Sequence, residues 1–221
     1  METQANKINV EVFKSWLTEQ KTIKALFRWE CSEEDAISLL CAAYQREVEV
    51  RGMSCDINQV YGYLQGIAKT MTGKSTKCGI LLCGNCGNGK TTSMEAFISV
   101  CKFLRALKGG CAQTGTNFLA STSARRLTQV AKDENCMSEA KNSRILCIDD
   151  IGLEPTEVLD YGNTINPVIE IIEQRYRQQL FTFITTNLTP KQIREKYGDR
   201  IADRFNEMMK CIVYKNPTFR R

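Results

Sequence analysis

A glycine-rich segment holds the residues of this sequence that are best suited to chemistry. Residues 84–91 read Gly-Asn-Cys-Gly-Asn-Gly-Lys-Thr, which fits the spacing G-x-x-x-x-G-K-[ST]. Glycines let a backbone curl so that successive N–H groups converge on phosphate oxygens. Lys90 can reach the β- and γ-phosphates of a nucleotide, and the Thr91 hydroxyl can ligate Mg²⁺. The residues expected to contact the phosphates are Gly84, Asn85, Cys86, Gly87, Asn88, Gly89, Lys90, Thr91 and Thr92.

Two acidic residues follow a second apolar run. Residues 144–150 read Arg-Ile-Leu-Cys-Ile-Asp-Asp, which is typical of a buried strand that delivers carboxylates to its carboxyl end. In a parallel sheet, ligands bind at that end. Asp149 is expected to hold Mg²⁺ through water, and Asp150 can orient the attacking water as a general base. Together with the glycine loop, this pair predicts a site that binds and hydrolyses a nucleotide.

Polar side chains also follow a later strand. Residues 180–185 are expected to form a strand that leads into Thr-Thr-Asn, and the amide of Asn187 beside a γ-phosphate can hold the lytic water. Further on, Arg200 and Arg204 are four residues apart, so they lie on one face of a helix. These three residues are candidates for the same site.

Alternating strands and helices must bring the candidates together. Strands are expected over 80–83, 116–120, 144–150, 180–185 and 211–214. Helices are expected over 90–107, 121–132 and 165–179 and again from 189 onward, whereas the polar residues 133–142 predict a loop or frayed helix. This alternation predicts an α/β fold with a doubly wound, five-stranded parallel sheet. The carboxyl ends of its strands would share one edge.

The N-terminal quarter carries none of these motifs. Ser32 followed by acidic residues is typical of a helix start, and a second helix is expected over 57–71. We expect a small helical domain at 1–52, which binds a partner, and an ATPase core at 53–221. Trp16 and Trp29 both lie in the first segment, where they fit either a partner surface or the core of a small domain.

Composition limits the chemistry further. The chain of 221 residues has 11 cysteines and no histidine, which excludes Ser-His-Asp and Cys-His catalysis and every zinc site that needs histidine. Cys83 and Cys86 have the CxxC spacing, but no second pair completes a zinc site. The net charge of +5 permits contact with nucleic acid. No apolar run spans a bilayer and no signal peptide is visible, so we expect a cytoplasmic protein with reduced thiols and no membrane contact.

Four sequence features occur in order: GNCGNGKT, ILCIDDIG, the Thr-Thr-Asn strand end and YGDRIADRF. Together they resemble a short AAA+ ATPase of the DnaC/IstB type over roughly residues 57–221. The resemblance implies that residues 84–91 are Walker A, that Asp149 and Asp150 are Walker B and that Asn187 is sensor 1. It also implies an AAA+ P-loop NTPase core without a full C-terminal lid.

The same resemblance implies roles for three arginines. Arg204, in Asp-Arg-Phe, matches an arginine finger that acts across a subunit interface, and Arg200 is the near alternative. Arg220, in Thr-Phe-Arg, matches the Ser-Tyr-Arg that provides a sensor-2-like contact to the nucleotide. A finger in trans makes hydrolysis depend on assembly, so weak activity is expected in the monomer.

The resemblance implies an ATP-binding and ATP-hydrolysing protein that uses Mg²⁺, oligomerises on DNA and recruits a replication protein. Its leading version is a DnaC-like loader of the replicative helicase, and the alternative is an IstB-like helper that directs a transposase to target DNA. A P-loop kinase for a small molecule is the alternative of another class. Asp150 stands where many AAA+ proteins have Glu, which favours a scaffold that barely hydrolyses ATP. Repeated copies of Arg125 and Arg126 in a ring or spiral would contact single-stranded or duplex DNA.

Overall fold

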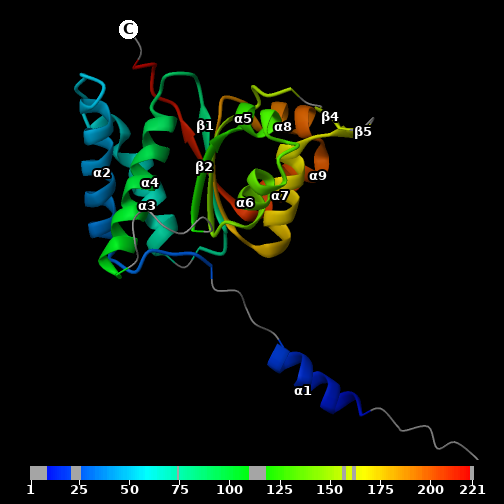
Figure 1. Cartoon of the computed structure of the whole chain (residues 1–221). Helices are drawn as coiled ribbons and strands as arrows, with labels where there is room; N and C mark the ends of the chain where they lie inside the picture. The colour runs from blue at the N-terminus through cyan, green and yellow to red at the C-terminus, as the bar shows by residue number, and fades with distance from the viewer. Residues whose placement is uncertain are drawn as a thin grey trace, which may run out of the picture.

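The central element of the computed structural model is a parallel sheet. The structure describes residues 9–20, 26–73, 75–109, 118–155, 158–160 and 163–219. Within these ranges the sheet has five strands in the order β2-β3-β6-β1-β7, and every neighbouring pair is parallel. Figure 1 shows this sheet between two groups of helices. The strands are β1 (Gly79–Gly84), β2 (Leu119–Ser123), β3 (Ile145–Ile151), β6 (Phe181–Thr186) and β7 (Met209–Tyr214). The predicted five-stranded parallel sheet is confirmed.

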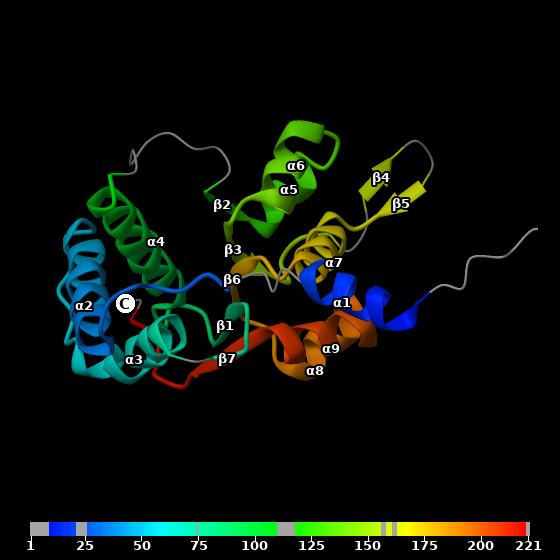
Figure 2. The same cartoon turned by 90° about the horizontal axis from the view of Figure 1, so that it is seen from below.

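One face of the sheet is covered by α2, α3 and α4, which Figure 2 shows gathered on the same side. They span Glu33–Glu49, Asn58–Thr72 and Lys90–Leu107. Leu40 of α2, Leu64 of α3 and Phe97 of α4 pack in one hydrophobic cluster with Ile80 and Phe183 of the sheet. Burial of such a side chain contributes about 1.5–3 kcal/mol to stability. This cluster therefore holds the start of α4, and the glycine loop before it, firmly against β1.

The other face is covered by the remaining helices of the described core. They are α5 (Ala124–Gln129), α6 (Glu134–Asn142), α7 (Pro167–Gln178), α8 (Pro190–Tyr197) and α9 (Asp199–Met208). Ile172 of α7, Ile193 of α8 and Phe205 of α9 belong to a second hydrophobic cluster, which includes Leu81 and Ile148 of the sheet. Because successive side chains in a strand point to opposite faces, β1 contributes to both clusters. The fold is doubly wound, as predicted.

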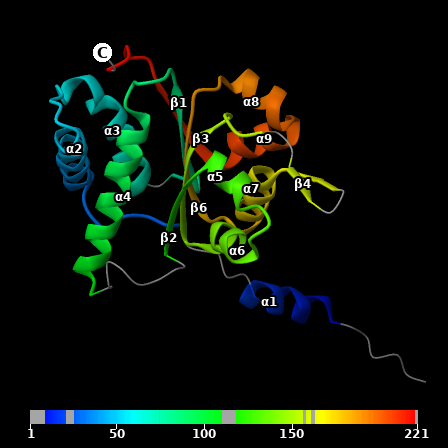
Figure 3. The same ribbon diagram turned by 45° about the horizontal axis from the view of Figure 1, so that its top comes forward.

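A hairpin that the sequence analysis does not predict precedes α7. It consists of β4 (Val158–Asp160) and β5 (Asn163–Ile165), which pair antiparallel. Figure 3 shows it on the α7 side of the sheet. The helix expected from residue 165 starts at Pro167 instead, because the side chain of Asn166 accepts a hydrogen bond from Ile169 N at 3.1 Å and caps the first turn.

Two elements between residues 116 and 142 differ from expectation. Strand β2 ends at Ser123 rather than at residue 120, because the Ser123 hydroxyl caps α5 by accepting from Arg126 N at 3.2 Å. The segment 133–142, expected as a loop or frayed helix, forms the regular helix α6. Its N-cap is Asp133, and the side chain of Met137 is buried on the inner side of the helix. Capping and one buried side outweigh the polar composition of this segment.

The N-terminal part of the chain is tied to the core at α2. Ser32 caps this helix as predicted, with its hydroxyl 3.0 Å from Asp35 N. Tyr44 of α2 lies in the same hydrophobic cluster as the sheet, so the packing continues across residue 52. The division into domains at residue 52 stays a prediction.

The two tryptophans have different surroundings. Trp29 is buried and stacks on Phe97, with ring centroids 5.4 Å apart. Trp16 lies on α1 (Val10–Gln20), is 52% exposed and stacks on Phe13. Trp29 therefore belongs to the core, whereas Trp16 belongs to an exposed apolar surface.

The described residues after β7, 215–219, contain no helix. Across the described ranges, no helix has both the length and the apolar character that crossing a membrane requires.

Candidate nucleotide-binding site

The glycine loop connects β1 to α4, and its backbone depends on glycine. Gly87 and Gly89 have φ values of +77° and +95°, a region that other residues rarely adopt. A Cβ atom at Gly89 would also collide with Tyr44 Oη of α2. Helix α4 begins at Lys90, so the free N–H groups of its first turn face the loop. This is the geometry that binds a phosphate chain.

Lys90 is buried, and neutral oxygens surround its ammonium group. Nζ lies 2.7 Å from Gly84 O, 2.8 Å from Asn85 O, 3.1 Å from Asn88 Oδ1 and 2.9 Å from Asn187 Oδ1. An ammonium has only three protons to donate, so the four oxygens share them. A phosphate would offer charged acceptors in place of neutral ones, and charge-assisted hydrogen bonds are about twice as strong.

Burial also sets the electrostatics of Lys90. Desolvation lowers the pKa of its ammonium, and the nearby carboxylate of Asp150 is the largest of the opposing influences. A cation that is costly to bury and faces a loop of N–H donors is stabilised when an anion binds beside it.

Thr91 and Asp149 meet beside the loop. Thr91 Oγ1 lies 3.0 Å from Asp149 Oδ1 and 3.3 Å from Asp149 Oδ2. A hydroxyl and a carboxylate at this separation are the oxygen ligands that Mg²⁺ prefers, next to phosphates that would supply further oxygens. The residues present therefore fit a magnesium ion bound together with a nucleotide.

Asp150 has an unusual backbone. Its φ is +54°, and the pairing of β3 with β6 shifts between Ile148 and Ile151. Asn187 Nδ2 donates to Asp150 Oδ1 at 3.4 Å, while Asn187 Oδ1 accepts from Lys90. Asn187 thus connects the lysine of the loop to the second carboxylate.

The chain after β7 passes over the glycine loop. Phe219 N donates to Gly87 O at 2.8 Å, and Asn216 Nδ2 donates to Asn88 O at 3.0 Å. Arg220, predicted to contact the nucleotide, lies outside the described residues.

The structure brings Lys90, Thr91, Asp149, Asp150 and Asn187 into one connected site at the carboxyl end of the sheet. Their predicted roles stay predictions. Thr92, also expected at the phosphates, is buried and accepts a hydrogen bond from Arg51 Nη1 at 3.0 Å.

Arg200 and Arg204 lie elsewhere, on α9 against α7. Arg204 Nη1 is 2.5 Å and Arg200 Nε 3.3 Å from the same atom, Glu173 Oε1. The Arg204 guanidinium also lies over the Tyr176 ring. The Arg204 side chain is 12% exposed and that of Arg200 is 67% exposed. Both side chains are thus held within their own chain, and Arg200 is much the freer of the two to reach another molecule.

Two contacts at the site escape the sequence analysis. The hydroxyl of Thr185 touches both Asp149 and Asp150, and Arg51 reaches Thr92. Thr185 stands two residues before Asn187, so strand alternation could have placed both on one side of β6. No pattern in the sequence connects Arg51 with residue 92.

The CxxC pair does not act as a unit. Cys83 Sγ lies 3.6 Å from Cys211 Sγ of the neighbouring strand β7, and Cys86 is an exposed residue of the loop. The hydrogen bond between the two thiols lowers the pKa of Cys211 to about 7. The described cysteines are free thiols.

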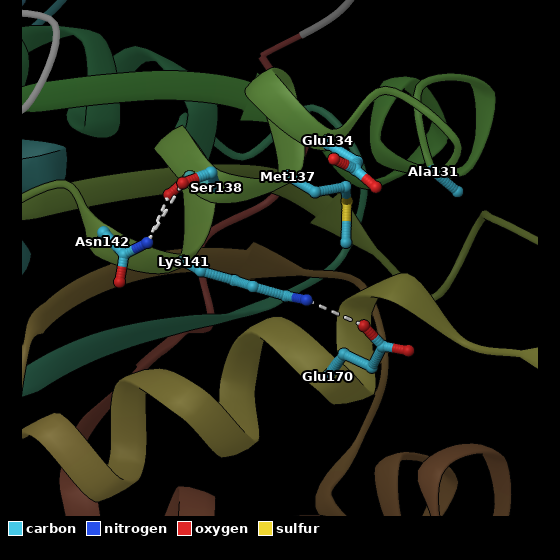
Figure 4. A pocket seen from close by; sticks show the side chains of 7 residues that line it. All are labelled: Ala131, Glu134, Met137, Ser138, Lys141, Asn142 and Glu170. Carbon is cyan, nitrogen blue, oxygen red and sulfur yellow. Dashed lines mark hydrogen bonds and ion pairs between the residues drawn. The ribbon is translucent and has the colours of Figure 1, made fainter.

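A separate groove lies between α6 and α7 (Figure 4). It has a volume of about 350 Å³, and the ion pair between Lys141 Nζ and Glu170 Oε2, 2.9 Å apart, crosses it. None of the residues that line it belongs to the predicted nucleotide site.

Solved structures of other proteins share this architecture, and three of them illustrate the likeness. A putative primosome component from Streptococcus pyogenes serotype M3 matches with a TM-score of 0.53 and 20% identity, over 75% of this chain and 85% of that chain. The DnaC helicase loader matches with a TM-score of 0.51 and 21% identity, over 73% and 92%. AMPPCP-bound DnaA from Aquifex aeolicus matches with a TM-score of 0.50 and 15% identity, over 72% and 46%. The fold is that of an AAA+ P-loop NTPase.

The likeness to DnaC predicted from the motifs is confirmed at the level of the fold. The chain spans less than half of the DnaA chain that it matches. No protein-family model and no curated protein matches the sequence.

Proposed function

We propose that this protein is a Mg²⁺-dependent ATPase that assembles on DNA and loads a replicative helicase. The observation that carries the ATPase is the connected set of Lys90, Asn187 and Asp150, with Thr91 and Asp149 beside it. The replication role is supported by fold neighbours described as a helicase loader and a putative primosome component. The nucleotide is supported by a neighbour bound to AMPPCP, an analogue of ATP.

Each residue of the set has a distinct task in this proposal. Lys90 binds the β- and γ-phosphates, and Thr91 and Asp149 hold Mg²⁺, the latter through water. The ion supplies neutralisation of phosphate charge. Asp150 orients the attacking water and accepts its proton, and Asn187 fixes the position of that water.

Hydrolysis is proposed to need a second copy of the chain. Neither Arg200 nor Arg204 contacts the loop of its own chain, so either would complete the site of a neighbour. The sequence motif favours Arg204, whereas exposure favours Arg200, because Arg204 would first have to leave a buried position against Glu173. An arginine finger contributes about 10³–10⁵ in rate.

A mixing experiment separates these possibilities. Lys90→Ala chains keep both arginines but lose the phosphate lysine. Arg204→Ala chains keep this lysine but lose Arg204. If Arg204 acts in trans, each variant alone is inactive and the mixture recovers ATPase activity. The same mixture with Arg200→Ala tests the alternative. Arg177→Ala is the matched control, because Arg177 is exposed and also pairs with Glu173. Wild-type turnover by assembled Arg200→Ala and Arg204→Ala chains would refute the finger altogether.

The proposed partner surface is α1. Its exposed Phe13 and Trp16 stack on each other, with Val10 and Leu17 on neighbouring turns. A helix with an exposed apolar side fits a hydrophobic groove on a partner. We expect Trp16→Ala to weaken capture of a purified hexameric replicative helicase, and Phe103→Ala, at 48% exposure on α4, to leave capture unchanged. Binding to a transposase instead of the helicase would favour the transposition helper.

DNA binding is proposed to use Arg125 and Arg126, which are exposed on α5.

The decisive experiment measures ATPase activity of the full chain across protein concentration, with and without single-stranded DNA. We expect turnover per chain to rise with concentration and with DNA, and DNA binding to weaken steeply with salt. Stimulation by a small metabolite and not by DNA would favour a kinase.

A further inference from the structure

Thr185 occupies a position between the two acidic residues of the candidate site. It belongs to β6, it is fully buried, and its side chain faces the end of β3. No motif in the sequence gives it a role.

The Thr185 hydroxyl makes a hydrogen bond in each direction. It donates to Asp149 Oδ1 at 2.5 Å and accepts from Asp150 N at 2.9 Å. A hydroxyl has one proton, which Thr185 donates to Asp149, and a lone pair of the same oxygen accepts the N–H of Asp150. One oxygen thereby fixes the side chain of the first acid and the backbone of the second.

The strand pairing explains why this contact is needed. Ile148 is opposite Ile184, and Ile151 is opposite Thr186. Two residues of β3, Asp149 and Asp150, therefore stand opposite Thr185 alone, which is the arrangement of a β-bulge. In a bulge the extra residue loses its regular ladder partner, and here the Thr185 hydroxyl receives the N–H of Asp150.

The bulge also determines where Asp150 points. Its φ of +54° is uncommon for a residue other than glycine and persists only where the surroundings enforce it. In this conformation the Asp150 carboxylate lies 3.4 Å from Asn187 Nδ2. The hydrogen bond to Thr185 is one of the contacts that hold the backbone there.

We propose that Thr185 is a positioning residue that orients Asp149 toward Mg²⁺ and turns Asp150 toward Asn187. The inference rests on the proposed function, because it assigns a task within the same ATP site. Residues that orient metal ligands typically change metal affinity or activity by 10–100-fold when they are replaced.

The test compares three variants. Thr185→Val removes the hydroxyl at nearly constant shape, and Thr185→Ser keeps it. Thr182→Val is the matched control, since Thr182 is equally buried on β6 but its hydroxyl bonds Arg175 and Leu180 at the far end of the strand. Two quantities are measured: the affinity for a fluorescent ATP analogue in EDTA, and the Mg²⁺ dependence of ATP binding and turnover.

We expect Thr185→Val to keep its affinity in EDTA within about twofold, to need about tenfold more Mg²⁺ for half-maximal binding and to turn over about 10–100-fold more slowly. Thr185→Ser should stay close to wild type in both measurements. Thr182→Val should lose stability without a change in Mg²⁺ dependence, because its hydroxyl is remote from the acids. If Thr185→Val does not fold, Thr185→Ala removes the same hydroxyl and is compared in the same way.

Two results would overturn the role of Thr185 alone: unchanged Mg²⁺ dependence in a folded variant without the hydroxyl, or a shifted dependence in Thr185→Ser. A wild-type chain that binds no ATP would instead refute the proposed function, and the role of Thr185 with it. A wild-type chain that binds ATP but hardly hydrolyses it leaves the Mg²⁺ dependence of binding as a full test.

Discussion

Two cations are buried at opposite ends of the same sheet, Lys90 at the carboxyl end of β1 and Arg175 beside the amino ends of β3 and β6. Both are held by neutral oxygens. The Arg175 guanidinium donates over 2.6–3.0 Å to Ala140 O, Ser143 O, Phe181 O and Thr182 Oγ1. Burial lowers the pKa of both side chains, that of Arg175 to about 9. Burial alone therefore does not distinguish a functional cation from a structural one.

The acceptors make the difference. Those of Arg175 lie at the end of α6 and the start of β6, where they tie fixed elements together. Those of Lys90 lie on the glycine loop and on Asn187, with two carboxylates nearby. A bound phosphate can replace the acceptors of Lys90, whereas the acceptors of Arg175 belong to the packed ends of α6 and β6. We therefore expect changes at the amino end to reduce stability and changes at the carboxyl end to reduce nucleotide chemistry.

The largest effect is expected from Arg175→Met. It removes the side-chain donor to four buried oxygens, so the free energy of unfolding should fall by roughly 3–5 kcal/mol. Urea unfolding measures this loss, and Arg177→Met, at an exposed position of the same helix, should change it by less than about 0.5 kcal/mol. A stable Arg175→Met protein that had lost ATP binding would reverse the comparison.

Lys90→Ala should have the opposite profile. Loss of the phosphate lysine should weaken ATP binding by about 100-fold, or about 2.7 kcal/mol, while the midpoint of urea unfolding changes little. Calorimetric titration with ATP measures the affinity, and Lys102→Ala on the exposed side of α4 serves as the control. Unchanged affinity for ATP in Lys90→Ala would show that the glycine loop does not bind the phosphates.

Asn187→Ala should sharpen the comparison at the carboxyl end. It removes both the acceptor of Lys90 and the donor to Asp150, so turnover should fall about tenfold, equivalent to about 1.4 kcal/mol, with ATP affinity less affected. Steady-state kinetics at saturating ATP separate the two effects. A loss in affinity without a loss in turnover would limit Asn187 to holding Lys90.

The smallest effect concerns the thiols. Burial raises the pKa of a thiol, whereas it lowers the pKa of a buried lysine or arginine. Desolvation raises the pKa of the buried Cys147 thiol, whereas the hydrogen bond with Cys83 lowers the pKa of Cys211 to about 7. The thiolate forms above its pKa, so alkylation of Cys211 by iodoacetamide should rise between about pH 6 and pH 8. Mass spectrometry should find Cys147 unmodified throughout. In Cys83→Ala the rise should move to higher pH, and an unmoved rise would exclude Cys83 as its cause.

The candidate site could be predicted where chemistry dictates residue type. The glycine loop, the Asp149–Asp150 pair and Asn187 were predicted because few residue types can bind phosphate and Mg²⁺, and the structure brings them together, while their roles stay predictions. Apolar strands with helices between them predicted the sheet, since both faces of such a sheet must be buried.

The remaining features depend on contacts between distant residues. Thr185 matters only because β3 carries an extra residue opposite it, and Arg175 only because α6 and β6 present oxygens to it. The packing of α2 with the sheet is equally invisible in an amphipathic pattern, which shows that a helix has an inner side but not what covers it.

The segment that crosses the glycine loop gives the protein a built-in reporter. The amide proton of Phe219 is engaged with Gly87 O, which belongs to the loop itself. An engaged amide exchanges with solvent deuterium only when its hydrogen bond opens. If the loop rearranges to receive phosphates, the exchange rate of this proton changes with it, whether or not hydrolysis follows. Isotope uptake at a single peptide group would then follow the occupancy of the site in real time.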